Sequence, residues 1–368
     1  MSDEVNNAAP ATNGQITEAM SRVEADDRMR SSTVLILSLR SVAHETIKNL
    51  VLAGIGRLIV MDDGAVTEED LGSGFLFREE DGAVGKNVSS SNGDYQLTDQ
   101  RTEAALAQIQ SLNPLVSLTA EPTLAPFVGS DGAPGDRAQM AEYLKREGVD
   151  VVVACDFARP QLEAINAAVR DADSMFFAAG SYGFYGYIFA DLGAKYENVA
   201  SALIKLQTNY VPLSQALDRS KWQDVETPAG KGGSPFRGLS KANTRQARPD
   251  LHIALQSLWD YEAKHGLPSS SAAAVEIQAT AEQMLKDLGV NKRTMRSVDE
   301  VIITHLAEHA THFFPPTLAI LGGLLAQDVL RALSRKDNPI TNLLVLDSMG
   351  GAASVARWGM DEAVIKKN

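Results

Sequence analysis

Two short apolar runs with an amphipathic segment between them constrain the fold of this chain more than any other feature. Thr33–Leu37 (TVLIL) and Arg57–Met61 (RLIVM) are rich in apolar residues, which is typical of strands buried on both faces of a parallel sheet. Between them, residues 45–53 place apolar side chains on one helical face, and Gly54 follows where the helix should end. A strand, a helix and a second strand within about 30 residues predict a right-handed βαβ unit.

The same alternation continues and predicts an α/β fold with a Rossmann-like, doubly wound and largely parallel sheet flanked by helices. Further strands are expected at 115–119, 151–154 and 174–178, and helices at 102–112, 136–147 and 161–170. From residue 196 to residue 312 the pattern changes to helical segments, which indicates a helical insertion. We interpret its Gly/Pro/Lys-rich stretch at 227–243 as a mobile loop.

We therefore divide the chain into four regions. They are a disordered lead at 1–15, the first part of the sheet domain at 16–195, a helical and loop insertion at 196–312, and a C-terminal return to the sheet domain at 313–368. The return should consist of a long apolar helix at 317–333 and a strand at 342–346.

Composition excludes several classes of protein. Acidic residues outnumber basic ones by 47 to 34, and the formal net charge of −13 repels nucleic acid and anionic lipid, so we expect neither as a partner. The N-terminus lacks the basic and apolar stretches of a signal peptide, and the apolar region at 313–326 is too short to span a bilayer, so we expect a soluble protein. Cys155 is the only cysteine, which excludes an intramolecular disulfide and favours a reducing, intracellular compartment.

The turn after the first predicted strand carries the main information about function. Nucleotide-binding turns at this place are rich in glycine, because side chains would hold the backbone away from phosphate. Here the turn from Ser38 to His44 (SLRSVAH) contains no glycine. The sequence therefore favours a sheet of this class without a working nucleotide pocket. Asp62 follows the second strand, where an acid could bind a ribose, but a turn or helix-capping acid explains it equally well.

Several separated motifs resemble the adenylation domain of the enzymes that activate ubiquitin and its relatives, a fold shared with the bacterial ThiF and MoeB proteins. Within that family the chain is most similar to the small, non-catalytic subunit of the heterodimeric SUMO-activating enzyme. The motifs lie at 48–87, 111–116 (SLNPLV), 180–193 (GSYGFYGYIFADLG) and 316–349. Their agreement, in the expected order and over about three-quarters of the chain, makes the resemblance specific.

The resemblance implies a subunit that helps an enzyme without catalysing the reaction itself. In the family, the catalytic subunit binds ATP and magnesium, adenylates the C-terminal glycine of SUMO and transfers SUMO to its own cysteine as a thioester. The small subunit packs against it as a heterodimer and lacks the thiol-bearing domain. We therefore expect no catalytic residue, cofactor or metal in this chain, and a catalytic subunit of the SUMO-activating enzyme as its partner, with SUMO reached through the complex.

Three residues are candidate remnants of a cofactor site. Active family members carry an N-x-x-R-Q run near ATP, but residues 70–74 read DLGSG and the arginine is absent. Lys86 matches a family lysine near the phosphates, and Asp156 stands where active members place a magnesium-linked acid. Together with Asp62, we interpret them as remnants of the fold.

The cysteine and three of the histidines could suggest catalysis or metal binding, but structural roles explain them better. Cys155 ends an apolar strand beside Asp156, which should raise the pKa of its thiol, so we expect structural packing. His305, His309 and His312 have a spacing that could hold zinc, but no cysteine or HExxH frame accompanies them. A solvated or hydrogen-bonded helix face is the favoured interpretation.

Two segments are candidates for the partner interface. Glycines and large aromatic residues at 180–186 suit a subunit contact, although core packing explains them equally well. Two adjacent glycines in the long C-terminal helix allow close approach of another helix. The interface candidates are Tyr182, Gly183, Phe184, Tyr185, Gly186, Gly322, Gly323 and Gln327.

Two departures from the family concern regions before and after the first βαβ unit. A Y-D-R-Q-I-R-L-W-G-like run, whose arginine reaches the partner's ATP in the family, is missing before the first strand, and only proximity recommends Arg22 as a substitute. A polar, turn-rich segment from Val88 to Gln100 interrupts an otherwise continuous match. We interpret both as gene-model errors, and transcript reads that support both junctions would contradict this hypothesis.

Other functions remain open from sequence alone. They are a self-sufficient ThiF-like adenylyltransferase, a subunit for another ubiquitin-like protein, and a nicotinamide-dependent dehydrogenase, and the glycine-free turn argues against the first and the last. The resemblance implies a nuclear protein with a share in the cytoplasm.

Overall fold

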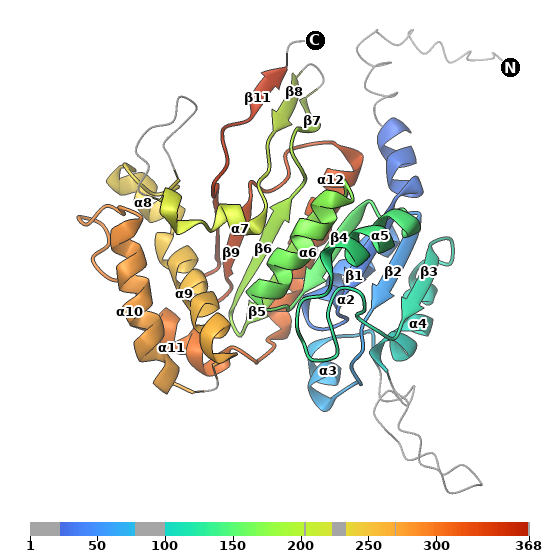
Figure 1. Ribbon diagram of the computed structural model, residues 1–368, viewed down its shortest axis with the longest axis horizontal. Helices are drawn as coiled ribbons and strands as arrows, with labels where there is room; N and C mark the ends of the chain where they lie inside the picture. Colours follow the sequence, from blue (N-terminus) through green and yellow to red (C-terminus); the bar gives the residue numbers. More distant parts are fainter. Residues whose placement is uncertain (1–22, 78–99, 202–203, 223–232, 269, 367–368) are drawn as a thin grey trace, which may run out of the picture.

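An eight-stranded sheet forms the centre of the molecule (Figure 1). The computed structural model describes residues 23–77, 100–201, 204–222, 233–268 and 270–366. The strand order is β10-β9-β6-β5-β4-β1-β2-β3, with the strands at Thr33–Leu37 (β1), Arg57–Met61 (β2), Ser117–Glu121 (β3), Val151–Cys155 (β4), Met175–Tyr182 (β5), Tyr185–Asp191 (β6), Leu343–Asp347 (β9) and Ala352–Ala356 (β10). Strands β1 to β5 pair in parallel, and β6, β9 and β10 continue the sheet in antiparallel pairs. The predicted largely parallel, Rossmann-like sheet is confirmed.

Helices cover both faces of this sheet. One face carries α2 (Val42–Ala53), α3 (Glu68–Ser73), α4 (Arg101–Leu112) and α12 (Pro315–Ser334). The other carries α5 (Arg137–Glu147), α6 (Arg159–Asp171), α7 (Leu213–Ala216), α9 (Pro249–His265), α10 (Ala272–Asp287) and α11 (Glu300–His309), and α8 (Lys241–Ala247) contacts the edge strand β10. Strand β1 is buried on both faces, because Leu35 and Leu37 enter one core and Val34 and Ile36 enter the other. This explains why residues 34–37 are all apolar.

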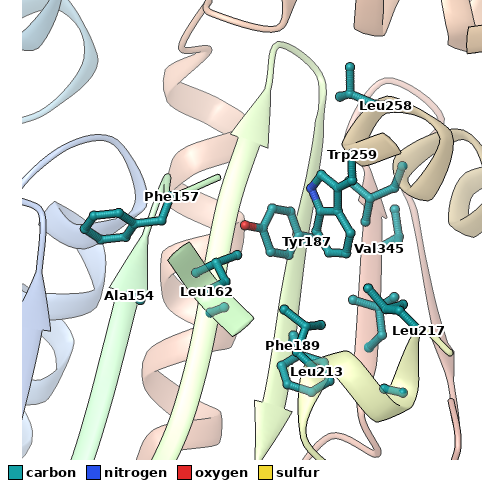
Figure 2. Close-up of a cluster of buried hydrophobic side chains, with 14 of the residues drawn as sticks. Ala154, Phe157, Leu162, Tyr187, Phe189, Leu213, Leu217, Leu258, Trp259 and Val345 are labelled. Atoms are coloured by element: carbon teal, nitrogen blue, oxygen red, sulfur yellow. The ribbon is translucent and has the colours of Figure 1, made fainter. Parts of the chain in front are cut away.

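Aromatic side chains fill the core on the α6 and α9 face. Figure 2 shows Tyr187 of β6 beside Trp259 of α9, and their ring centroids lie 4.8 Å apart in an edge-to-face arrangement. The insertion between β6 and β9 therefore shares one continuous core with the sheet and is not a separate unit.

The helix α12 is long and apolar enough to cross a membrane by length and composition, at 20 residues. It packs along α2 on the sheet, and 61% of its most apolar window is buried inside the protein. Its hydropathy is therefore that of a core helix. The predicted helix at 317–333 is confirmed, with two more residues at its start and one more at its end.

Two expectations about the insertion are wrong. Residues 196–208 are not helical but form the strands β7 (Tyr196–Ser201) and β8 (Ile204–Thr208), which join β11 (Val364–Lys366) in a three-stranded antiparallel sheet. Tyr196 and Asn198 are buried around the exposed Glu197 side chain, the two-residue period of a strand. The stretch at 227–243 is partly packed, because Phe236 is buried and helix α8 begins at Lys241, whereas residues 227–232 lie outside the described chain.

Smaller differences concern the ends of elements. Helix α2 begins three residues earlier than expected, at Val42, directly after the glycine-free turn. Strand β3 begins two residues later, at Ser117. The 1–15 lead, Arg22, Lys86 and residues 88–99 of the polar segment lie outside the described residues.

Candidate functional site

The carboxyl ends of β1, β2 and β4 meet at one edge of the sheet. Strand β1 lies between β2 and β4, and the helices that follow β1 and β4 pack on opposite faces, which makes this the switch point where open α/β sheets bind ligands. The turn from Ser38 to Ser41 follows β1, Asp62 follows β2 and Asp156 follows β4. The structure thus brings the turn and two of the three remnant candidates together.

The turn itself has a backbone that glycine would adopt with less strain. Ser38 and Ser41 have φ angles of 69° and 43°, in the left-handed region. Side chains stand at every position of this turn, where glycines would let a phosphate approach the backbone, and Leu39, Ser41 and Val42 are buried. The residues present therefore do not fit a phosphate group against this main chain.

Asp62 is bonded to the protein instead of being free for a ribose. Its Oδ2 atom accepts a hydrogen bond from the Leu39 N–H at 2.7 Å, and its Oδ1 atom accepts one from the Gly64 N–H at 2.7 Å. The side chain is buried. Asp62 therefore ties the end of β2 to the turn after β1.

Arg101 completes this closure from the start of α4. Its Nη1 atom lies 3.3 Å from Asp62 Oδ1, and its Nε and Nη2 atoms each lie 3.0 Å from Asp70 Oδ2. All three side chains are at most 10% exposed. Asp70 also completes a capping box with Thr67 at the start of α3. Residues 70–74, where the family's arginine run was sought, thus belong to a capped helix and its end.

His44 seals the N-terminal end of α2. Its Nε2 atom lies 3.0 Å from the Leu39 carbonyl oxygen, and the rings of Phe75 and Phe77 meet it edge-on. Burial lowers the pKa of His44 to about 4, so the ring is neutral at pH 7. Gly74 packs so closely that a Cβ atom there would lie 1.8 Å from His44 Nδ1. Residues 74–77 therefore pack against the first turn of α2 through His44.

Asp156 is held by the same closed arrangement. The Ser41 hydroxyl donates to Asp156 Oδ2, and the Ser181 N–H lies 3.3 Å from Oδ1. Burial raises the pKa of this carboxyl to about 6, against the lowering effect of the Ser41 hydrogen bond and of Arg40. One carboxyl oxygen of Asp156 thus bonds the turn and the other bonds β5. Across the described chain, no group of three His, Cys, Asp or Glu side chains is arranged to hold a metal ion.

Cys155 lies at the end of β4 and is buried. Burial and the neighbouring Asp156 raise the pKa of its thiol well above the usual value. The expected structural packing is confirmed. A cavity of about 910 Å³ exists elsewhere, between α8, β10 and residues 357–362, and does not reach the turn.

Most of the aromatic and glycine interface candidates at 182–186 pack inside the protein. Tyr182 and Tyr185 are buried, and the Tyr182 hydroxyl accepts a hydrogen bond from Trp259 Nε1 at 3.0 Å. A Cβ atom on Gly186 would lie 2.8 Å from Leu321, so that glycine permits helix α12 to approach β6. Phe184, at the tip of the β5–β6 hairpin, is partly exposed. The core explanation therefore fits Tyr182, Tyr185 and Gly186, and Phe184 keeps access to a partner.

The two adjacent glycines of α12 face different surroundings. A Cβ atom on Gly322 would lie 2.6 Å from the Glu45 Cβ and 3.0 Å from the Val42 carbonyl oxygen, so Gly322 permits the close α2–α12 contact. A Cβ atom on Gly323 would meet nothing within 4 Å. Ala319, Ile320 and Gln327 are exposed on the same outward side. Packing within the chain therefore explains Gly322 and leaves Gly323 without an explanation.

Comparison with known proteins places the chain in a family. A model of the ThiF family matches residues 13–362, and the chain belongs to the ThiF family. This confirms the resemblance and the fold class drawn from the sequence.

Individual relatives extend along nearly the whole chain. SUMO-activating enzyme subunit 1 of Rattus norvegicus is 27% identical over 359 residues, covering 92% of this chain and 91% of the relative. The Homo sapiens protein of that name is 26% identical over 358 residues, covering 92% of each chain. The DNA damage tolerance protein RHC31 of Saccharomyces cerevisiae is 25% identical over 343 residues, covering 88% of this chain and 90% of the relative. A solved structure of E. coli MccB with succinimide matches 92% of this chain and 67% of its own, with 13% identity and a TM-score of 0.48.

Proposed function

We propose that this chain is the non-catalytic subunit of a SUMO-activating enzyme. It pairs with a catalytic subunit that binds ATP and magnesium, adenylates SUMO and carries the thioester cysteine. Relatives named SUMO-activating enzyme subunit 1, aligned over 92% of the chain, support SUMO as the modifier.

The sealed turn is the observation that carries this proposal. No glycine opens this turn, Asp62 is bonded to the Leu39 and Gly64 amides, and the buried His44 bonds the Leu39 carbonyl. A ThiF-family chain with this turn needs a second subunit to hold the nucleotide. We therefore place ATP and magnesium in the partner and no catalytic residue in this chain.

The outward side of α12 and the β5–β6 hairpin tip are the surface that we assign to the partner. A glycine within a helix costs roughly 1 kcal/mol relative to alanine, and a partner helix lying against Gly323 would account for that cost. Phe314, 37% exposed, and Ile320, 46% exposed, continue this surface from the start of the helix. Beside it, the only ion pair of Arg40 within the described residues is a 3.9 Å contact with Glu69, and its buried Nε atom has no hydrogen-bond partner. We expect an acidic group of the catalytic subunit opposite Arg40.

Reconstitution tests the division of labour. The chain and a catalytic subunit are purified separately and mixed, and ATP–pyrophosphate exchange and the SUMO thioester are measured. We expect neither reaction with this chain alone and both with the pair. Exchange by the isolated chain would contradict the proposal and favour a self-sufficient adenylyltransferase.

A matched pair of variants tests the surface. Gly323→Leu places a large side chain on the outward side of α12, and Ala279→Leu places the same side chain on an exposed position of α10. We expect Gly323→Leu to raise the Kd for the catalytic subunit roughly tenfold or more, because it blocks close approach, and Ala279→Leu to leave it unchanged. Equal affinities for both variants would exclude this side of α12 from the interface.

The proposal includes a nuclear location with a share in the cytoplasm, as expected of a subunit that works with its SUMO-activating partner. Imaging of the tagged full chain measures this distribution. Exclusion from the nucleus would contradict it.

A further inference from the structure

Three backbone groups at the tip of the β5–β6 hairpin are hydrogen-bonded to other parts of the chain: both N–H groups of Gly183 and Phe184, and the Phe184 carbonyl. The Gly183 N–H donates to the His312 carbonyl at 3.0 Å, and the Phe184 N–H donates to His305 Nε2 at 3.1 Å. The Phe184 carbonyl accepts from the Ser348 N–H at 3.0 Å and from the Ser348 hydroxyl at 2.8 Å. Two segments far from the hairpin in sequence, residues 305–312 and Ser348, thus hold two residues of one turn.

His305 makes the one contact in this set that depends on a side-chain acceptor. Accepting the Phe184 N–H requires Nε2 to be unprotonated, so the ring must be neutral with its proton on Nδ1. The ring also stacks on Phe184 at 4.9 Å and on His309 at 4.3 Å, and it meets Tyr185 edge-on at 5.3 Å. A Cβ atom on Gly183 would collide with the same ring, so the tip and the imidazole fit each other closely.

The surroundings of His305 keep it neutral at working pH. Burial lowers its pKa to about 4, helped by His309 and His312 and opposed by Asp347 at the end of β9. Asp347 is itself paired with Arg248 at 3.4 Å. The acceptor state of His305 therefore does not change between pH 6 and pH 8.

The fixed tip supports an exposed aromatic surface. The Phe184 ring meets Phe314 edge-on at 4.6 Å, and Met349, 62% exposed, follows the clamping residue Ser348. Helix α12 begins directly after Phe314, so this surface is continuous with the outward side of α12. Aromatic and methionine side chains are enriched at protein–protein interfaces.

We propose that His305 is a positioning residue for subunit pairing, which holds Phe184 and Phe314 in the arrangement that the catalytic subunit binds. This inference rests on the proposed function and adds the residue that prepares the surface. A preformed surface loses less conformational freedom on binding. The hydrogen bonds of His305 and Ser348 with Phe184, which we call the clamp, supply that preorganisation.

Two His305 variants separate positioning from packing. His305→Phe keeps an aromatic ring for stacking and removes the acceptor, whereas His305→Gln keeps a neutral acceptor. His265→Phe, at an exposed histidine of α9, is the control. The Kd for the purified catalytic subunit and the thermal midpoint of the free chain are measured at pH 7.

We expect His305→Phe to raise the Kd roughly tenfold, and His305→Gln and His265→Phe to stay within about threefold of the original chain. Exchange of the Phe184 amide hydrogen in the free chain should quicken in His305→Phe alone. An unchanged Kd for His305→Phe, or equal losses for the Phe and Gln variants, would overturn the inference while leaving subunit pairing intact.

A second variant serves if His305→Phe does not fold. Ser348→Ala removes the hydroxyl that bonds the Phe184 carbonyl and the Thr317 hydroxyl, and it keeps the bond from the Ser348 N–H to Phe184. We expect a Kd increase of about threefold. No change in Kd would count against the clamp. If the original chain does not bind the catalytic subunit, or binds only a second copy of itself, the proposed function and this inference fail together.

Discussion

Two turns at the same edge of the sheet differ in what they expose: one is closed by buried side chains, and the other presents aromatic rings at the surface. The turn from Ser38 to Ser41 is closed by side chains that bond to each other, through Asp62, Asp156 and Arg101. The hairpin tip at Gly183 and Phe184 is bonded from beneath and leaves aromatic rings at the surface. The first arrangement removes a ligand site, and the second prepares a surface for a partner. Long-range contacts thus determine the role of each turn as much as its local sequence does.

Removing the buried ion pairs of Arg101 with Asp62 and Asp70 should give the largest change in the free energy of unfolding. Arg101→Ala leaves the buried carboxylates of Asp62 and Asp70 without their cation, and we expect a loss of about 3–5 kcal/mol in the free energy of unfolding. Urea unfolding measures this loss. Hydrogen exchange should quicken at the Leu39 amide, which donates a hydrogen bond to Asp62, and should not change at the Phe184 amide.

The exposed pair Arg137–Asp171 supplies the control, because its side chains are 59% and 43% exposed. Arg137→Ala should cost about 0–1 kcal/mol. Similar losses for Arg101→Ala and Arg137→Ala would mean that the turn does not depend on the buried ion pairs.

The buried Asp156 beside the closed turn should make the free energy of unfolding depend on pH. The pKa of Asp156 is raised to about 6 in the folded chain, from 3.8, so the folded state holds a proton that the unfolded state has released between these values. This group's contribution to stability therefore falls as pH rises from about 4 to about 6, by about 1.4 kcal/mol per pH unit. Asp156→Asn lacks this dependence.

We expect Asp156→Asn to gain about 2 kcal/mol relative to the original chain when the comparison moves from pH 4 to pH 7. Taking the difference between two pH values cancels the constant effect of altered hydrogen bonds to Ser41 and Ser181. Glu262→Gln is a useful comparison below the hairpin, because burial raises the pKa of Glu262 to about 8 and its dependence should extend to higher pH. Parallel stability curves for the original chain and Asp156→Asn would contradict the raised pKa.

Apolar runs predicted much of the fold, because a strand buried on both faces must be apolar throughout. Strands β1, β2 and β4 lie within a residue of their predicted positions. The β7–β8 hairpin was missed because its small sheet is half exposed, so its strands carry polar residues such as Glu197. Local periodicity therefore predicted the central sheet well and the half-exposed insertion poorly.

The candidate site could be predicted in part. The absence of glycine between Ser38 and His44 favoured a turn without a nucleotide pocket, and the structure shows buried side chains in that turn. The role of Arg101 could not be predicted, because its partners lie 39 and 31 residues earlier and the pairing depends on how α3 and α4 meet. The Thr67-x-x-Asp70 capping box was the one local signal for that region.

The smallest effect comes from the adjacent glycines of α12, which border the two regions compared above. Gly322 contacts the start of α2 behind the closed turn, and a Cβ atom there would lie 2.6 Å from the Glu45 Cβ, so Gly322→Ala should cost roughly 1–3 kcal/mol through overpacking. Gly323 faces open space, and Gly323→Ala should stabilise the free chain by up to about 1 kcal/mol because alanine favours the helix. Urea unfolding of both variants measures the contrast. Equal signs would show that the two faces of α12 are not distinct in the free chain, and the argument that a partner accounts for Gly323 would lose its basis.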